Sequence, residues 1–141
     1  MSPSPDLAAQ ALRLARTYNE YADALRDRAR ELWERDKIDE DEYDKVRKLY
    51  DRMRGVSQTL STKASTMAAQ GIDAALDRLK AATDDLEKSR RKLDGIANVV
   101  GVAAKLVAAT AAIAAMVTAP SPGTVLTAAV ALEAVVTTVA G

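Results

Sequence analysis

Apolar residues recur through the first 94 residues at alternating spacings of three and four positions. This repeat places an apolar stripe along one side of an α-helix. The first stripe continues to about residue 35, and Arg28 fills one of its positions. Its other members are Leu7, Ala11, Leu14, Tyr18, Tyr21, Leu25 and Leu32. We expect a first amphipathic helix capped by Asp6, because Pro3 and Pro5 disfavour helix before that residue.

Two further stripes with the same spacing follow. Residues 36–39 predict a turn, and Asp39 with Glu42 three residues later matches a capping box at the start of a second helix. The second stripe is Val46, Tyr50, Met53, Ser57, Leu60, Ala64 and Met67. Gly71 is the next expected break. The third stripe is Ile72, Leu76, Leu79, Thr83, Leu86, Arg90 and Leu93. Three such helices predict an antiparallel, coiled-coil-like bundle.

The pattern changes at residue 95. From there to residue 141 only Lys105 and Glu133 are charged. Two uncharged or nearly uncharged segments, 96–119 and 124–140, flank a turn that no helix continues through. The turn consists of Pro120, Ser121, Pro122 and Gly123. We therefore expect an apolar helical hairpin, whose segments of about 24 and 17 residues compare with the ~20 needed to cross a bilayer.

These patterns predict an all-α protein, an elongated antiparallel helical bundle with a C-terminal apolar helical hairpin. Its expected parts are a disordered N-terminus over residues 1–5, a charged three-helix stalk over 6–94 and the hairpin over 95–141. The first residues have neither the basic start nor the apolar core of a secretory signal. We therefore expect synthesis in the cytoplasm without a signal peptide.

Composition narrows the classes of function. The chain contains no cysteine and no histidine, which removes thiolate chemistry, the commonest general base and the commonest metal ligand. No glycine-rich phosphate loop or nucleophile motif is present. Twenty basic residues balance twenty acidic ones, so the charge gives no basic footprint for nucleic acid. We expect a non-enzymatic protein with no catalytic residue, cofactor or metal site and no nucleic-acid partner.

A helix that is apolar all round must be buried by protein or by lipid. Lipid is favoured by the uncharged turn and by small residues spaced for close helix packing, namely Ala104, Ala108 and Ala112, and Ala111 and Ala115. It is also favoured by basic residues just before the hairpin that could contact lipid headgroups, namely Lys88, Arg90, Arg91 and Lys92. No Trp or Tyr flanks the hairpin helices, which argues against permanent membrane residence.

Lys105 and Glu133 are the polar exceptions within the hairpin. A charge in the middle of a membrane is costly, so we expect each to pair with the other or with a neighbouring subunit, or to line a pore. In a soluble bundle both would simply reach solvent at its edge.

The layout, a helical stalk with an apolar hairpin, resembles that of α-helical pore-forming toxins, secretion translocators and some phage lysis proteins. That layout implies a membrane-associated protein whose hairpin, residues 96–140, inserts into a lipid bilayer and self-assembles into a homo-oligomer. The stalk would then serve assembly or bind a protein partner. The alternative is a soluble oligomeric scaffold or adaptor with the hairpin as its buried core.

Overall fold

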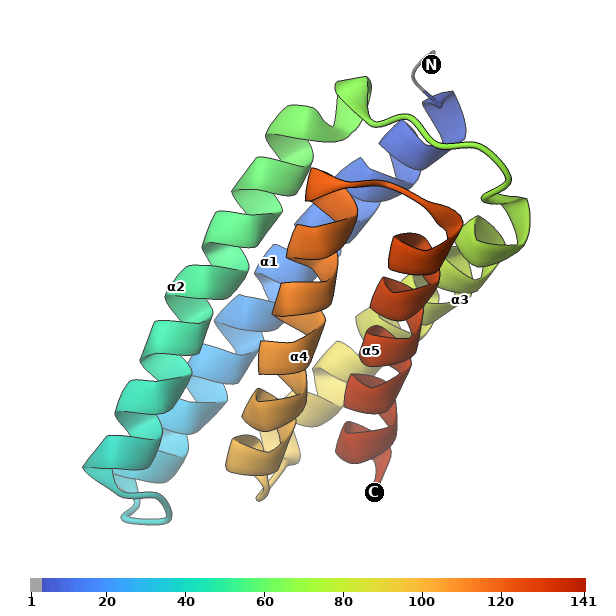
Figure 1. Ribbon diagram of the computed structural model, residues 1–141. Coiled ribbons are helices and arrows are strands. Elements are labelled where there is room, and N and C mark those ends of the chain that lie inside the picture. The colour runs from blue at the N-terminus through green and yellow to red at the C-terminus, as the bar shows by residue number, and fades with distance from the viewer. Residues whose placement is uncertain (1–3) are drawn as a thin grey trace.

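The computed structural model describes residues 4–141 and is all-helical over that range (Figure 1). The α-helices are α1 (Pro5–Glu34), α2 (Glu40–Lys63), α3 (Asp73–Ser89), α4 (Val99–Thr118) and α5 (Pro122–Ala140). Short 3₁₀ segments, η1 (Ala64–Thr66) and η2 (Arg90–Gly95), follow α2 and α3. The predicted all-α bundle with a C-terminal helical hairpin is confirmed. Of the predicted disordered residues 1–5, residues 1–3 lie outside the described part of the chain, and Pro5 already belongs to α1.

The starts of the first two helices show how side chains set their boundaries. The prediction that Asp6 caps α1 is wrong, because the N-cap is Ser4, whose Oγ accepts a hydrogen bond from the Leu7 amide at 3.4 Å. Pro5 is tolerated at the first helical position because its missing N–H would have no partner there. The capping box of α2 is confirmed: the Glu42 amide donates to Asp39 Oδ1 at 2.8 Å, and the Asp39 amide donates to Glu42 Oε1 at 3.0 Å.

The predicted breaks also occur. Gly71 lies between η1 and α3 with a φ of +67°, a conformation that side-chain-bearing residues rarely adopt. The turn between α4 and α5 closes with a second capping box, in which Ser121 Oγ accepts from the Thr124 amide at 3.1 Å. Asn98 caps α4 by accepting from the Gly101 amide at 3.0 Å.

The five helices form a ring around one core. The α1–α2 and α4–α5 hairpins are each antiparallel, α2 packs beside α4, and α3 packs mainly on α5 and also on α1 (Figure 1). Helices α2 and α4 run in the same direction, as do α3 and α5. Because α3 finds its main apolar partner in α5, the change of composition at residue 95 is not a boundary between two cores.

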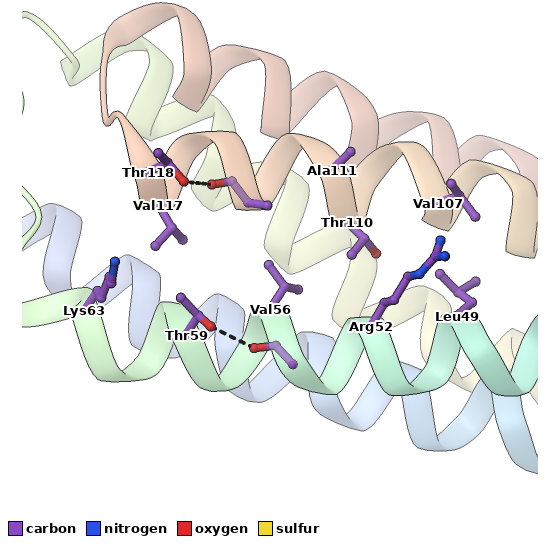
Figure 2. Close-up of a pocket in the computed structure, with 12 residues that line it drawn as sticks. Leu49, Arg52, Val56, Thr59, Lys63, Val107, Thr110, Ala111, Val117 and Thr118 are labelled. Carbon is purple, nitrogen blue, oxygen red and sulfur yellow. Dashed lines mark hydrogen bonds between the residues drawn. The ribbon is translucent and has the colours of Figure 1, made fainter.

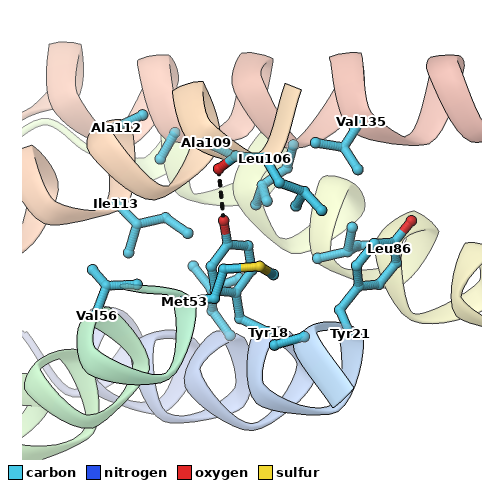
Figure 3. Packing of buried hydrophobic residues seen from close by; sticks show 14 of the residues in the cluster. Tyr18, Tyr21, Met53, Val56, Leu86, Leu106, Ala109, Ala112, Ile113 and Val135 are labelled. Carbon is cyan, nitrogen blue, oxygen red and sulfur yellow. Dashed lines mark hydrogen bonds between the residues drawn. The ribbon is translucent and has the colours of Figure 1, made fainter. Parts of the chain in front are cut away.

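Every helix contributes fully buried side chains to that core (Figure 3). They include Tyr18, Tyr21, Met53, Leu86, Leu106, Ile113 and Val135. The two tyrosine hydroxyls are hydrogen-bonded: Tyr18 Oη lies 2.6 Å from Thr110 Oγ1 and 3.3 Å from the Leu106 carbonyl oxygen, and Tyr21 Oη lies 3.0 Å from Ser89 Oγ. Burial raises the pKa of Tyr21 to about 12 and raises that of Tyr18 as well. Tyr18 thereby ties α1 to the hairpin, and Tyr21 ties it to α3.

Candidate functional site

Neither helix of the C-terminal hairpin is central in the bundle. Both are long and apolar enough to cross a membrane by length and composition, yet only 50% of the apolar window of α4 and 33% of that of α5 are buried. Each helix therefore places one side in the core and leaves the other side uncovered by the rest of the chain.

We call this uncovered side the outer face of the hairpin. Its exposed residues include Val100, Ala104, Lys105, Val107, Ala108, Ala111, Ala114, Ala115, Thr118, Leu126, Thr127, Val130 and Thr137. Six large hydrophobic side chains are exposed among residues 4–141, and four of them, Val100, Val107, Leu126 and Val130, lie on the outer face. Large exposed apolar side chains gathered on one hairpin indicate an interaction surface.

The threonines of the outer face do not make it polar. Thr118 donates its hydroxyl to the Ala114 carbonyl at 2.9 Å, and Thr127 and Thr137 donate to the carbonyls of Gly123 and Glu133 at 2.8 and 3.0 Å. Each bond joins residues four apart within one helix, so each hydroxyl proton already has an acceptor. An apolar environment could cover these side chains without leaving their donors unpaired.

The predicted small-residue ridges lie mostly on this face. Ala104, Ala108, Ala111 and Ala115 are exposed, whereas Ala112 is buried with an exposed fraction of 8%. The ridges thus remain available for close approach by another helix, and their role in assembly stays a prediction.

The hairpin turn lies at one end of the ring, opposite the C-terminus (Figure 1). Pro122 and Gly123 are exposed, and Pro120 and Ser121 are partly buried. Thr124 Oγ1 also donates to the Ala119 carbonyl at 2.9 Å across the turn. The turn is therefore uncharged, accessible and closed by its own hydrogen bonds.

The two charged residues of the hairpin do not pair with each other. Arg78 of α3 donates from Nε and Nη2 to the two carboxylate oxygens of Glu133, both at 2.8 Å. The Glu133 carboxylate raises the pKa of Arg78 through this hydrogen bond. Lys105 is exposed and forms no ion pair within residues 4–141. Arg78 is 55 positions from Glu133 in the sequence, so no spacing along the chain indicated this pair.

The predicted basic headgroup cluster lies among acidic groups, since Lys88, Arg90 and Arg91 line one pocket together with Asp84 and Glu87. Arg90 pairs with Glu20 of α1 at 3.1 Å, and Arg90 and Arg91 line a pocket that also contains four carboxylates. Those carboxylates belong to Glu20, Asp23, Asp27 and Asp94. Lys88 and Lys92 are exposed. The two arginines therefore face acidic groups on the α1 side of the bundle, which lies behind α4 in Figure 1.

Sequence reasoning missed a groove between α2 and α4 (Figure 2). It consists of two cavities of about 440 and 340 Å³ that share the lining residues Leu49, Arg52 and Val107. The α4 side is uncharged, whereas the α2 side carries four cations. These are Lys45, Lys48, Arg52 and Lys63, which we call the cation row. The sequence did carry a signal for the cation row: spacings of three, four and eleven residues place all four cations on one side of a helix.

Within residues 4–141, no group of three or more His, Cys, Asp or Glu side chains is placed to hold a metal ion. Comparison with known proteins found no similarity: no protein-family model, no curated protein and no solved structure matches the chain.

Proposed function

We propose that this protein is membrane-active. The outer face of the α4–α5 hairpin docks on a lipid bilayer, and the hairpin then inserts, turn first, and assembles with the hairpins of other copies. The observation that carries the proposal is the incomplete burial of two helices that have membrane-spanning length and composition.

Transfer of the exposed apolar side chains from water to lipid supports a first, reversible docking step. Val107 and Val130 are 48% and 45% exposed, and moving such a half-exposed side chain from water to hydrocarbon gains about 1 kcal/mol. The four large side chains of the outer face together gain about 4 kcal/mol. A single acyl anchor gains more than this and still holds a protein at a membrane only marginally, so the docked protein needs a second source of affinity.

Insertion follows from the chemistry of the hairpin once it is docked. Its backbone is helical and its threonine hydroxyls donate hydrogen bonds to that backbone. Transfer into lipid therefore leaves the backbone and hydroxyl hydrogen-bond donors within these helices paired. The uncharged turn, Pro120–Gly123, can lead across the hydrocarbon layer without desolvating a charge. In this step the ion pair between Glu133 and Arg78 breaks. Glu133 and Lys105 then contact another copy of the chain or line the pore.

Flotation with lipid vesicles tests the docking step. We expect the full-length protein to float with vesicles, and Val107→Asp or Val130→Asp to lower the bound fraction at least about tenfold, because each places a carboxylate against hydrocarbon. The matched control is Leu12→Asp on α1, since Leu12 is 48% exposed, like Val107, but lies outside the outer face.

The Leu12→Asp protein should float like wild type. The proposal fails if wild-type protein stays in the soluble fraction with every vesicle composition, or if Leu12→Asp lowers flotation as much as Val107→Asp does. Dye release from the same vesicles reports insertion separately from docking.

A self-assembling soluble scaffold is the second candidate, favoured by the exposed alanine ridges. Ala108→Leu adds bulk on a ridge without touching the core, so it should dissociate an oligomer built there. Light scattering of lipid-free protein decides between the candidates: a stable wild-type oligomer that Ala108→Leu breaks, together with no flotation, supports the scaffold.

A further inference from the structure

The cation row extends along one edge of the outer face. Its members span 18 positions of α2, or about 27 Å at the helical rise per residue. None of the four forms an ion pair within residues 4–141, whereas many arginines elsewhere in this range are paired with carboxylates. Lys45, Lys48 and Arg52 lie within two turns of α2 and repel one another, so they favour an external anion.

One carboxylate, that of Glu42, lines the groove. Glu42 closes the capping box of α2 through its Oε1, which accepts from the Asp39 amide at 3.0 Å. Glu42 forms no ion pair within residues 4–141, so the lining of the groove carries four positive charges and one negative charge.

The cation row and the outer face can meet the same surface. Val100 and Val107 belong to the outer face and also line the groove opposite Lys48 and Arg52. Arg52 extends from α2 toward Val107 (Figure 2). When apolar residues enter the interface of a bilayer, long basic side chains beside them extend to the headgroup level.

The other flank of the outer face differs. There Arg78 is neutralised by Glu133, and nearer the end of α3 Arg90 is paired with Glu20. The unpaired cations that line a groove against the hairpin are therefore those of α2.

We infer that Lys45, Lys48, Arg52 and Lys63 bind the headgroups of anionic lipids, so that the bilayer this protein selects is an anionic one. This inference rests on the proposed function and names the class of lipid it requires. A bilayer is favoured over an acidic helix of a partner protein because one helix in the groove would leave Leu126 and Val130 on α5 uncovered.

The test compares two double variants that remove equal charge. Lys48→Gln with Arg52→Gln removes two members of the cation row, and Arg16→Gln with Lys37→Gln removes two exposed cations outside both the row and the predicted headgroup cluster. Partitioning is measured on phosphatidylcholine vesicles with and without phosphatidylglycerol, after circular dichroism shows that each variant is folded.

We expect wild-type protein to prefer the anionic vesicles. Each cation near such a surface contributes about fivefold in partitioning, so the Lys48/Arg52 variant should lose about 25-fold on anionic vesicles and little on neutral ones. Added salt should reduce the wild-type preference. The Arg16/Lys37 variant should keep most of the preference.

Three results would overturn the inference alone: equal wild-type binding to both vesicles, equal losses in the two variants, or a full preference retained by the Lys48/Arg52 variant. In the last case an acidic protein partner becomes the better occupant of the groove. Absence of wild-type binding to either vesicle overturns the proposed function itself and the inference with it.

Discussion

The α1–α2 hairpin and the α4–α5 hairpin are alike on their inner sides and different on their outer sides. Both bury an apolar stripe in the common core. On the outer side of α1–α2, Arg26 lies 4.5 Å from the centre of the Tyr50 ring, and Tyr50 Oη donates to Asp23 at 2.9 Å. Arg54 also pairs with Asp23.

The outer face of α4–α5 has no such network. Alanine, valine, leucine and threonine cover it together with Lys105, and the threonine hydroxyls donate to backbone carbonyls of their own helix. Folding needs only the inner stripe, as α1 and α2 demonstrate. The apolar outer side of α4–α5 therefore requires an explanation outside the folded chain, and a lipid bilayer is the one we propose.

The largest difference in stability between an inner and an outer position is expected when two adjacent side chains of α4 are shortened to alanine. Leu106 is fully buried and Val107 is 48% exposed. Leu106→Ala should lower the free energy of unfolding by about 2–5 kcal/mol, because it opens a cavity. Val107→Ala should change it by less than about 0.5 kcal/mol. Urea denaturation measures both, and similar losses would contradict the assignment of two distinct sides.

High pH should produce the second-largest effect, a loss of stability in the common core of the five helices. The unfolded chain releases tyrosine protons above the ordinary pKa of about 10, whereas folded Tyr21 keeps its proton until about pH 12. The stabilisation is complete below pH 10 and falls as pH rises through 12, by about 2–3 kcal/mol from this residue. Tyrosinate absorbance and helical circular dichroism should change together. Ionisation of the buried tyrosines at pH 10 in a still helical protein would contradict the packing.

A single hydroxyl tests the contact between α1 and the hairpin. Tyr18→Phe removes the bond to Thr110 but keeps the ring, so we expect a loss of about 1 kcal/mol in the free energy of unfolding. Thermal or urea unfolding gives the value. Because Thr110 Oγ1 still donates to the Leu106 carbonyl, a much larger loss would indicate a different arrangement around Tyr18.

The smallest effect is expected at the edge between α5 and α3. Arg78 and Glu133 are substantially exposed, with side-chain exposed fractions of 48% and 35%, so their ion pair contributes little despite its two-bond geometry. Arg78→Gln should change the free energy of unfolding by less than about 1 kcal/mol. A loss of several kcal/mol in urea would show that this pair, rather than apolar packing, holds the hairpin on α3.

Local patterns predicted the helices well. The three stripes, the capping box at Asp39, the break at Gly71 and the turn at Pro120–Gly123 depend on residues close together in sequence, and all four occur in the structure. The N-cap of α1 was predicted at Asp6, two residues after its position at Ser4, because the prediction did not allow proline at the first helical position.

The partners of each charge could not be predicted in the same way. Glu133 meets Arg78, and Arg90 meets Glu20, only because the ring brings α3 beside α5 and η2 beside α1. The cation row was visible as a spacing on α2, but the apolar wall opposite it belongs to α4, and only the fold joins the two.

The most direct test of the central claim locates the surface that meets lipid. Because the chain contains no cysteine, a single cysteine can carry an environment-sensitive nitrobenzoxadiazole dye at Val107, or at Leu12 as an equally exposed control. On adding vesicles that contain phosphatidylglycerol, the account predicts a brighter, blue-shifted emission at position 107 and no change at position 12. An unchanged spectrum at position 107, or the same shift at both positions, would contradict it.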